Sequence, residues 1–328
     1  MRTLDGRYQL KQRIGVGGMS EVWRAHDQVL DRPVAVKLIA PGPDERRGPV
    51  ERIRAEARWA ARLEHPNVAS VHDFGTSSAR SGQPVPYIVM ELAEGETLAV
   101  HLRAGPLDWR IAARVCAEVA AALAAAHAEG IVHRDVKPAN VILTPAGVKV
   151  LDFGIAIPAG APDPMPEGMV VGTPAYLAPE QLDGAPATPA ADMYALGVLL
   201  YYSLTARLPY HAATTSELLG VRRRQAPQPL PPIDGLPPEV AELCHSCLAE
   251  DPERRPTSLV AALLLAEAVD ARVYVPMTLP TTRQPTLPSP WTERAAAEAT
   301  EAIAVAEAMS VPETVSAGEP ADGPGRTG

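Results

Sequence analysis

Residues 133–143 read HRDVKPANVIL and place three polar side chains, Asp135, Lys137 and Asn140, within six positions. Pro138 excludes a continuous helix, so the segment is predicted to be a loop. Twelve residues after Asn140, Asp152 follows the apolar run VKVL and opens the tripeptide DFG. Phosphoryl transfer needs a carboxylate to orient a hydroxyl and a cation beside the moving phosphoryl group. It also needs groups that hold a metal, here an amide and a second carboxylate, so the set is complete. The spacing therefore predicts phosphoryl transfer.

A glycine-rich turn near the N-terminus, IGVGGMSEVWRA, suits close approach of backbone amides to a phosphate. It is not a Walker A loop, because no Gly-Lys-Ser/Thr follows. It is a poor dinucleotide-binding fingerprint, because Ser20 occupies the third glycine position and a strand follows where a helix is required. Alone, such a turn is weak evidence for any nucleotide.

Lys37 ends the apolar run VAVK, 22 residues after Gly15, which suits a hairpin that returns beneath the glycine-rich turn. A lysine at this position is either the exposed end of an edge strand or a phosphate ligand. Glu56 lies on the next predicted helix and could pair with it. The pattern by itself leaves both interpretations open.

The elements that position these residues follow from hydrophobic periodicity and from Gly and Pro punctuation. Strands are predicted within residues 8–40 and at 67–75 and 86–92, with a helix at 49–63 between them. Helices are predicted at 108–130, 188–205 and 237–250. A β-rich lobe and an α-rich lobe therefore meet near residues 91–97.

Bulk composition narrows the class of protein. A net charge of −9 over 328 residues argues against nucleic acid or an anionic membrane as the main partner. The three cysteines are too few for a disulfide framework, and CHSC at 244–247 has no second Cys/His pair for zinc. No apolar leader is visible, and the longest apolar runs fall short of the roughly 20 residues that span a bilayer. A cytoplasmic protein without a membrane span is predicted.

Taken together, the motifs resemble the eukaryotic-like (Hanks-type) serine/threonine protein kinases of bacteria, over about residues 8–268. The resemblance implies an α+β, two-lobed protein kinase fold. Residues 8–92 form an N-lobe of antiparallel sheet with one main helix, and residues 93–268 form a mainly α-helical C-lobe. Residues 269–328, rich in Pro, Ala and Thr, are predicted to be a disordered tail, with a short helix at 292–309 as an option. GVGGMSEV looks like the glycine loop of receptor-type relatives, but their membrane helix and extracellular repeats are not expected here.

The resemblance assigns roles residue by residue. Asp135 matches the catalytic base and Lys137 the cation at the γ-phosphate of ATP, while Asn140 and Asp152 match the ligands of Mg²⁺, with Mn²⁺ as an alternative. The implied ATP-binding set comprises the glycine loop, the adenine-facing residues, the Lys37–Glu56 pair, the gatekeeper Met90 and the hinge: Ile14, Gly15, Val16, Gly17, Gly18, Met19, Ser20, Glu21, Val22, Ala35, Lys37, Glu56, Met90, Glu91, Ala93 and Ile142. Glu180 paired with Arg255, and Asp192 bracing the catalytic loop, are implied structural roles.

The expected substrates are Ser/Thr hydroxyls of proteins, including the chain itself, because DVKPAN and GTPAYLAPE are Ser/Thr-kinase forms. Two alternatives stay open: a pseudokinase scaffold and a small-molecule kinase of related fold. The first is disfavoured by the complete residue set and the second by the segment around Thr173. Thr281, Thr282 and Thr286 are predicted autophosphorylation sites for a phospho-binding partner, with an inert linker as the alternative.

The loop between Gly154 and Thr173 contains no Ser, Thr or Tyr. In many relatives a phosphothreonine in this loop pairs with the arginine of HRD, here Arg134. The corresponding window, residues 165–169, reads MPEGM. Either Glu167 substitutes for the phosphate or nearby prolines and glycines hold the loop. The prediction is an enzyme that does not require phosphorylation there.

Overall fold

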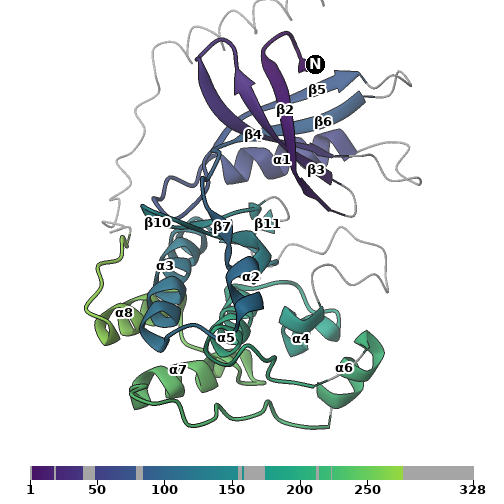
Figure 1. The fold of residues 1–328 in the computed structure, drawn as a ribbon. Helices are drawn as coiled ribbons and strands as arrows, with labels where there is room; N and C mark the ends of the chain where they lie inside the picture. Colours follow the sequence, from purple (N-terminus) through teal and green to yellow (C-terminus); the bar gives the residue numbers. More distant parts are fainter. Residues whose placement is uncertain are drawn as a thin grey trace, which may run out of the picture. The chain divides into compact units, whose positions relative to one another are not determined.

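The computed structural model describes residues 2–17, 20–39, 49–78, 84–153, 157–158, 174–211, 214–222 and 224–275. These residues belong to one unit of the chain, Met1–Met277, whereas the unit Thr278–Gly328 lies outside them. The predicted tail, its optional helix and Thr281, Thr282 and Thr286 therefore lie outside the described residues. Figure 1 shows the described unit as a sheet-rich lobe with α1 and a helix-rich lobe.

The N-lobe is built on a mostly hairpin-connected sheet. Within the described residues the strands form a six-stranded antiparallel sheet in the order β1-β2-β3-β4-β6-β5. Their bounds are β1 Thr3–Leu4, β2 Tyr8–Val16, β3 Ser20–Asp27, β4 Arg32–Ile39, β5 Val71–Ser78 and β6 Pro84–Met90, and helix α1 spans Pro49–Ala60. Successive strand side chains point to opposite faces. Accordingly Val34 and Val36 pack in one cluster, whereas Ala35 packs with Ile53 and Ala57 of α1 in the other.

The C-lobe begins with short elements at the junction of the lobes and continues in longer helices. A three-stranded sheet, β10-β9-β7, and a two-stranded sheet, β11-β8, are described here. The short strands are β7 Glu96–Thr97, β8 Ile131–Val132, β9 Val141–Thr144, β10 Gly147–Val150 and β11 Ile157–Pro158. The helices are α2 Leu98–His101, η1 Leu102–Ala104, α3 Trp109–Ala128, η2 Pro138–Asn140, η4 Pro174–Tyr176, α4 Pro179–Leu182, α5 Pro189–Thr205, α6 Thr215–Arg222, α7 Pro238–Cys247, η5 Pro252–Arg254 and α8 Ser258–Ala268.

Helix α3 is the centre of the C-lobe core. Asp108 caps it by accepting a hydrogen bond from the backbone N–H of Arg110 at 2.8 Å. Most of its side chains are buried alanines and valines that pack with α5 and α8. Small side chains allow these helices to approach closely at interior packing density. By length and apolar composition α3 could also cross a bilayer, but most of it is buried inside the lobe, as in the core helix of a globular domain.

The cysteines of CHSC are core residues. Cys244 and Cys247 are buried on α7, where Gly197 of α5 approaches Cys247 so closely that an added Cβ would lie 2.7 Å from the cysteine Cβ. Burial raises the pKa of the Cys247 thiol to about 12, so the thiolate that binds metal is disfavoured. Among the described residues, no group of three or more His, Cys, Asp or Glu side chains is arranged so that it could hold a metal ion. The structure therefore supports a packing role for Cys244 and Cys247.

Several predicted boundaries differ from the structure: the strand predicted at 86–92 is β6, Pro84–Met90, and the helix predicted at 237–250 ends at Cys247. The helix predicted at 49–63 ends at Ala60, and the strand predicted from Asn67 begins at Val71. Residues 67–69 pair elsewhere, because the N–H of Ala69 donates to the carbonyl of Val150 at 3.0 Å and the N–H of Val150 donates to Asn67 at 2.8 Å. The β-like pattern of this segment therefore reflects pairing with the C-lobe.

Candidate active site

The predicted catalytic loop lies between β8 and β9, at the top of the C-lobe. Lys137 Nζ lies 2.6 Å from Asp135 Oδ2. The Asn140 amide nitrogen donates to the Asp135 backbone carbonyl at 2.8 Å and to Asp135 Oδ2 at 3.0 Å. The three residues that the spacing singled out are thus brought together, and the Asp135 carboxylate is held by two donors.

Asp192, near the start of α5, holds the backbone of this loop through hydrogen bonds. Its carboxylate accepts the backbone N–H groups of His133 and Arg134, each at 2.8 Å, and lies 2.9 Å from His127 Nε2 of α3. Burial alone raises the pKa of Asp192, but its hydrogen bond with His127 and the nearby His133 hold that pKa below the usual range. Arg134 has φ +70°, a left-handed conformation that needs such support. The bracing role implied for Asp192 matches these contacts.

The ring of His133 joins the loop to the DFG segment. Its Nδ1 accepts the N–H of Asp135 at 3.2 Å, so Nε2 carries the proton and donates to the Leu151 carbonyl at 2.9 Å. The ring also packs edge-on against Phe153, with centroids 4.4 Å apart. The N–H of Leu151 donates in turn to the Asn140 carbonyl at 2.8 Å. Asp152 is therefore fixed next to the catalytic loop.

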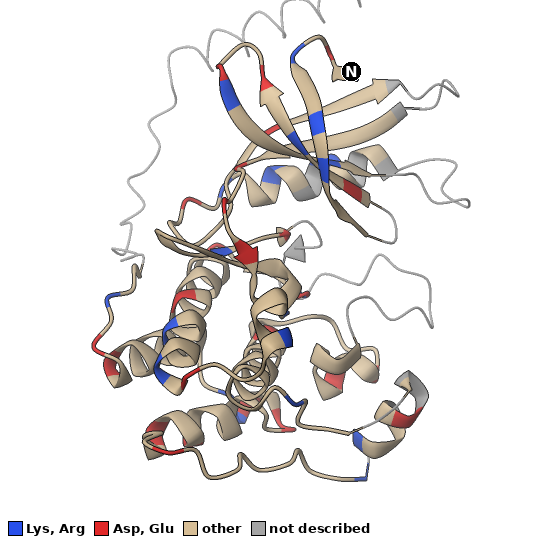
Figure 2. Ribbon diagram, viewed as in Figure 1, with Lys and Arg blue, Asp and Glu red and all other residues tan. Residues whose placement is uncertain are grey.

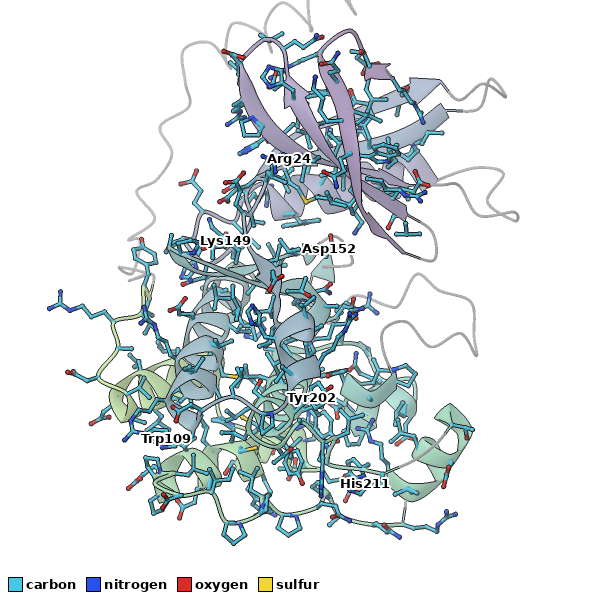
Figure 3. All side chains as sticks on the ribbon, in the orientation of Figure 1. Arg24, Trp109, Lys149, Asp152, Tyr202 and His211 are labelled. Carbon is cyan, nitrogen blue, oxygen red and sulfur yellow. The ribbon has the colours of Figure 1, made fainter. Side chains whose placement is uncertain are left out.

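Lys37 of β4 crosses from the N-lobe to the DFG segment. Its Nζ lies 2.7 Å from Asp152 Oδ1, and both side chains are largely shielded from solvent. Asp152 has φ +57°, a backbone turn that directs its carboxylate at the junction of the lobes (Figure 3). The Glu56 side chain, the partner implied for Lys37, lies outside the described part of α1. The pairing of Lys37 and Glu56 thus stays a prediction.

Most residues that the resemblance assigns to ATP binding lie on β2, β3, β4 and β6 of the N-lobe sheet. Ala35 is buried and pairs across the sheet with Met90, while Val22 pairs with Lys37. In the glycine loop, the N–H of Gly17 donates to the Ser20 carbonyl at 2.7 Å, and Gly18 and Met19 lie outside the described residues. Ile14, Gly15, Val16 and Glu21 lie on the paired ends of β2 and β3 that flank this turn. Ile142 lies on β9, in the C-lobe below.

The residues that the resemblance assigns to the gatekeeper and the hinge, Met90 to Ala93, connect the two lobes. A small cavity of about 30 Å³ lies behind Met90, between α1 and the DFG segment. The N–H of Glu91 donates to the Ser70 carbonyl at 2.8 Å, and its carboxylate lies 2.7 Å from Lys149 Nζ on β10. Ala93 follows in the same extended segment. These contacts hold the hinge against the C-lobe, and the sequence pattern gave no indication of Lys149.

Glu180 and Arg255 form the implied structural pair. The two guanidinium NH₂ groups donate to the two carboxylate oxygens at 2.7 and 2.8 Å. Arg255 also donates to the backbone carbonyls of residues 190, 249 and 250, and its side chain is fully buried. This bidentate pair fixes the end of the segment GTPAYLAPE to the core of the C-lobe.

The donor set at the junction suits a hard divalent cation. With its amide nitrogen facing Asp135, Asn140 has its oxygen free of that bond, and Asp152 uses only Oδ1 on Lys37. An amide and a carboxylate oxygen are few ligands, which fits Mg²⁺ shared with phosphate oxygens and water rather than an all-protein cage. The residues present therefore fit magnesium–ATP.

Comparison with known proteins gives the same result as the motifs. The family model described as a protein kinase domain matches residues 8–269. The serine/threonine-protein kinase PknA of Mycobacterium tuberculosis (strain ATCC 25618 / H37Rv) is 44% identical over 255 residues, 77% of this chain and 59% of that protein. PrkC of Bacillus subtilis (strain 168) is 36% identical over 258 residues, 77% of this chain and 39% of its own. The match thus spans less than two thirds of these relatives.

Proposed function

The chain belongs to the bacterial Hanks-type serine/threonine protein kinases, and we propose that it transfers the γ-phosphoryl group of ATP to Ser and Thr hydroxyls of proteins, itself included. The observation that carries the proposal is the convergence of Lys37, Asp135, Lys137, Asn140 and Asp152 at the junction of the lobes. A pseudokinase or a small-molecule kinase remains the alternative that activity measurements decide.

Each residue contributes a defined part of the chemistry. The Asp135 carboxylate orients the acceptor hydroxyl and takes its proton, and Lys137, 2.6 Å away, neutralises charge on the transferring group. Lys37 holds the α- and β-phosphates. Asn140 and Asp152 hold Mg²⁺, which supplies charge neutralisation at the phosphates when bound. Because phosphoryl transfer involves little covalent work by the protein, preorganised position and charge account for catalysis.

The test is phosphate transfer from ATP to casein and to the chain itself. Lys37→Met and Asp135→Asn should each lower both rates by at least about 10²–10³-fold while the fold is retained. Lys11→Met and Asp31→Asn, both on exposed residues of the N-lobe, are matched controls that should keep wild-type rates. Wild-type protein that turns over ATP with neither substrate, or mutants as fast as wild type, would contradict the proposal.

We also propose that the enzyme does not need phosphorylation of its activation loop, the segment 152–180 that contains the stretch from Gly154 to Thr173. The support is the sequence, which offers no hydroxyl between these two residues. The window with Glu167 lies outside the described residues, so a Glu167–Arg134 latch rests on the sequence alone. Protein produced with a phosphatase and shown by mass to carry no phosphate should react without a lag. A lag that ends as phosphate accumulates within residues 152–180 would refute the idea, and Glu167→Gln tests the latch separately.

A further inference from the structure

The segment 174–178, next to Thr173, is held by an arginine that no motif of the sequence identifies. Figure 2 shows a basic residue at one end of α6, and the basic residue in the last turn of this helix is Arg222. Its Nη1 donates to the Pro174 carbonyl at 3.2 Å, and its Nη2 donates to the Leu177 carbonyl. One side chain therefore binds the first residue of η4 and the residue that follows this helix, across 48 and 45 residues of sequence.

The guanidinium of Arg222 is itself fixed by two aromatic rings. Its carbon lies 5.0 Å from the ring centroid of Tyr194 on α5 and 5.4 Å from that of Tyr210. Burial raises the pKa of both phenols, so the rings stay neutral and keep a negative face for the cation. Stacking on the rings restrains the planar guanidinium, so less conformational entropy is lost when it binds the two backbone carbonyls.

Arg222 and Arg255 act on the two ends of one segment. Arg255 binds Glu180 and also lies 5.2 Å from the centroid of the Tyr194 ring. The stretch from Pro174 to Glu180 is thus fixed at its start by Arg222 and at its end by Arg255, and Tyr194 contacts both arginines. The Ala178 N–H additionally donates to Gln181 Oε1 at 3.0 Å, which fixes the turn between them.

We infer that Arg222 is a positioning residue for the protein substrate: it sets the backbone beside Thr173 on which the acceptor segment docks. The inference rests on the proposed function, since it names how that same site is kept ready. Two bonds from a stacked cation give this segment a fixed shape without a phosphate on the preceding loop, which has no hydroxyl to carry one. The Asp135–Lys137 pair is held by different contacts: Asn140 donates to Asp135, and Asp192 accepts the backbone N–H groups of the two preceding residues, His133 and Arg134.

This division of contacts predicts a specific kinetic pattern for Arg222→Ala. Loss of both charged hydrogen bonds should lower kcat/KM for casein by roughly 10- to 100-fold. The slow hydrolysis of ATP by water and the Kd for nucleotide should stay within about twofold of wild type, because Lys37, Asp135 and Asp152 are untouched. Arg222→Lys, which keeps the charge but has no fork, should fall between wild type and Arg222→Ala.

Arg224→Ala is the matched control, because Arg224 lines the adjacent cleft and its removal leaves both carbonyl bonds in place. It should retain wild-type kinetics. Equal losses of casein phosphorylation and ATP hydrolysis in Arg222→Ala would show a general structural role and overturn the inference, as would unchanged kcat/KM. If Arg222→Ala fails to fold, the folded Arg222→Lys variant decides: an unchanged kcat/KM for casein refutes the inference. Wild-type enzyme that phosphorylates no protein refutes the proposed function instead.

Discussion

Removal of the buried guanidinium of Arg255 should be among the most destabilising single changes in the C-lobe. The Arg255 side chain is 0% exposed and that of Glu180 is 17% exposed. Arg255→Leu leaves the Glu180 carboxylate without its bidentate partner and three backbone carbonyls without their donor. Breaking a buried pair from one side costs about 3–5 kcal/mol, because the remaining charge stays buried.

For a domain of this size that loss corresponds to a fall in Tm of about 6–20 °C. Urea unfolding followed by circular dichroism, together with thermal melting, measures it. Arg254→Leu is the matched control, because the neighbouring side chain is exposed and should change the free energy of unfolding by less than about 0.5 kcal/mol. An Arg255→Leu variant within about 1 kcal/mol of wild type would refute the reasoning from burial and geometry.

Three further changes test other parts of the framework. Asp192→Asn places an NH₂ group against a backbone N–H of the catalytic loop in either orientation, so the free energy of unfolding should fall by about 1–3 kcal/mol and phosphoryl transfer should slow. Gly95→Ala should lower Tm, because the new Cβ would lie 2.0 Å from the Leu143 carbonyl oxygen. His65→Gln should flatten the loss of stability below about pH 6.5, because burial lowers the pKa of the native imidazole and only the unfolded chain gains its proton there.

Each of these has a measurement that can contradict it. Wild-type kcat and Tm in Asp192→Asn would show that the carboxylate does not brace the loop. An unchanged Tm in Gly95→Ala would mean that the hinge can move away from β9 at little cost. For His65, the urea midpoint should fall less between pH 8 and 5 in the Gln variant than in wild type, and parallel curves would exclude the histidine as the cause.

The sequence could predict that Asp135, Lys137 and Asn140 lie together because their motif is local. Asp135, Lys137 and Asn140 lie within six positions, and their contacts in the structure follow from one short loop. The strands of the N-lobe were predicted for a similar reason, since alternation such as Val34, Ala35, Val36 records burial on two faces. Local patterns therefore predicted the two lobes from periodicity and the grouping of these three side chains from spacing.

The missed features depend on contacts that no local pattern records. Arg222 binds carbonyls 45 and 48 positions away, and Lys149 binds Glu91 at a separation of 58. His65 contacts Tyr274 across 209 residues, so the chain after α8 packs against the segment between α1 and β5. Each partner is an ordinary surface-type residue in sequence, and only the tertiary fold selects it. The start of β5 was predicted wrongly for the same reason, because residues 67–69 pair with Val150, far away in the sequence.

The single carboxylate of Asp192 also has a consequence for the order in which the domain folds. Its partners lie on α3 and on the catalytic loop, 58 to 65 residues earlier in the chain. Closing such a long loop costs entropy that only an already packed helix pair offsets. We therefore expect α3 and α5 to associate first and the left-handed turn at Arg134 to form late, with its amides the slowest in the C-lobe to gain protection from hydrogen exchange during refolding.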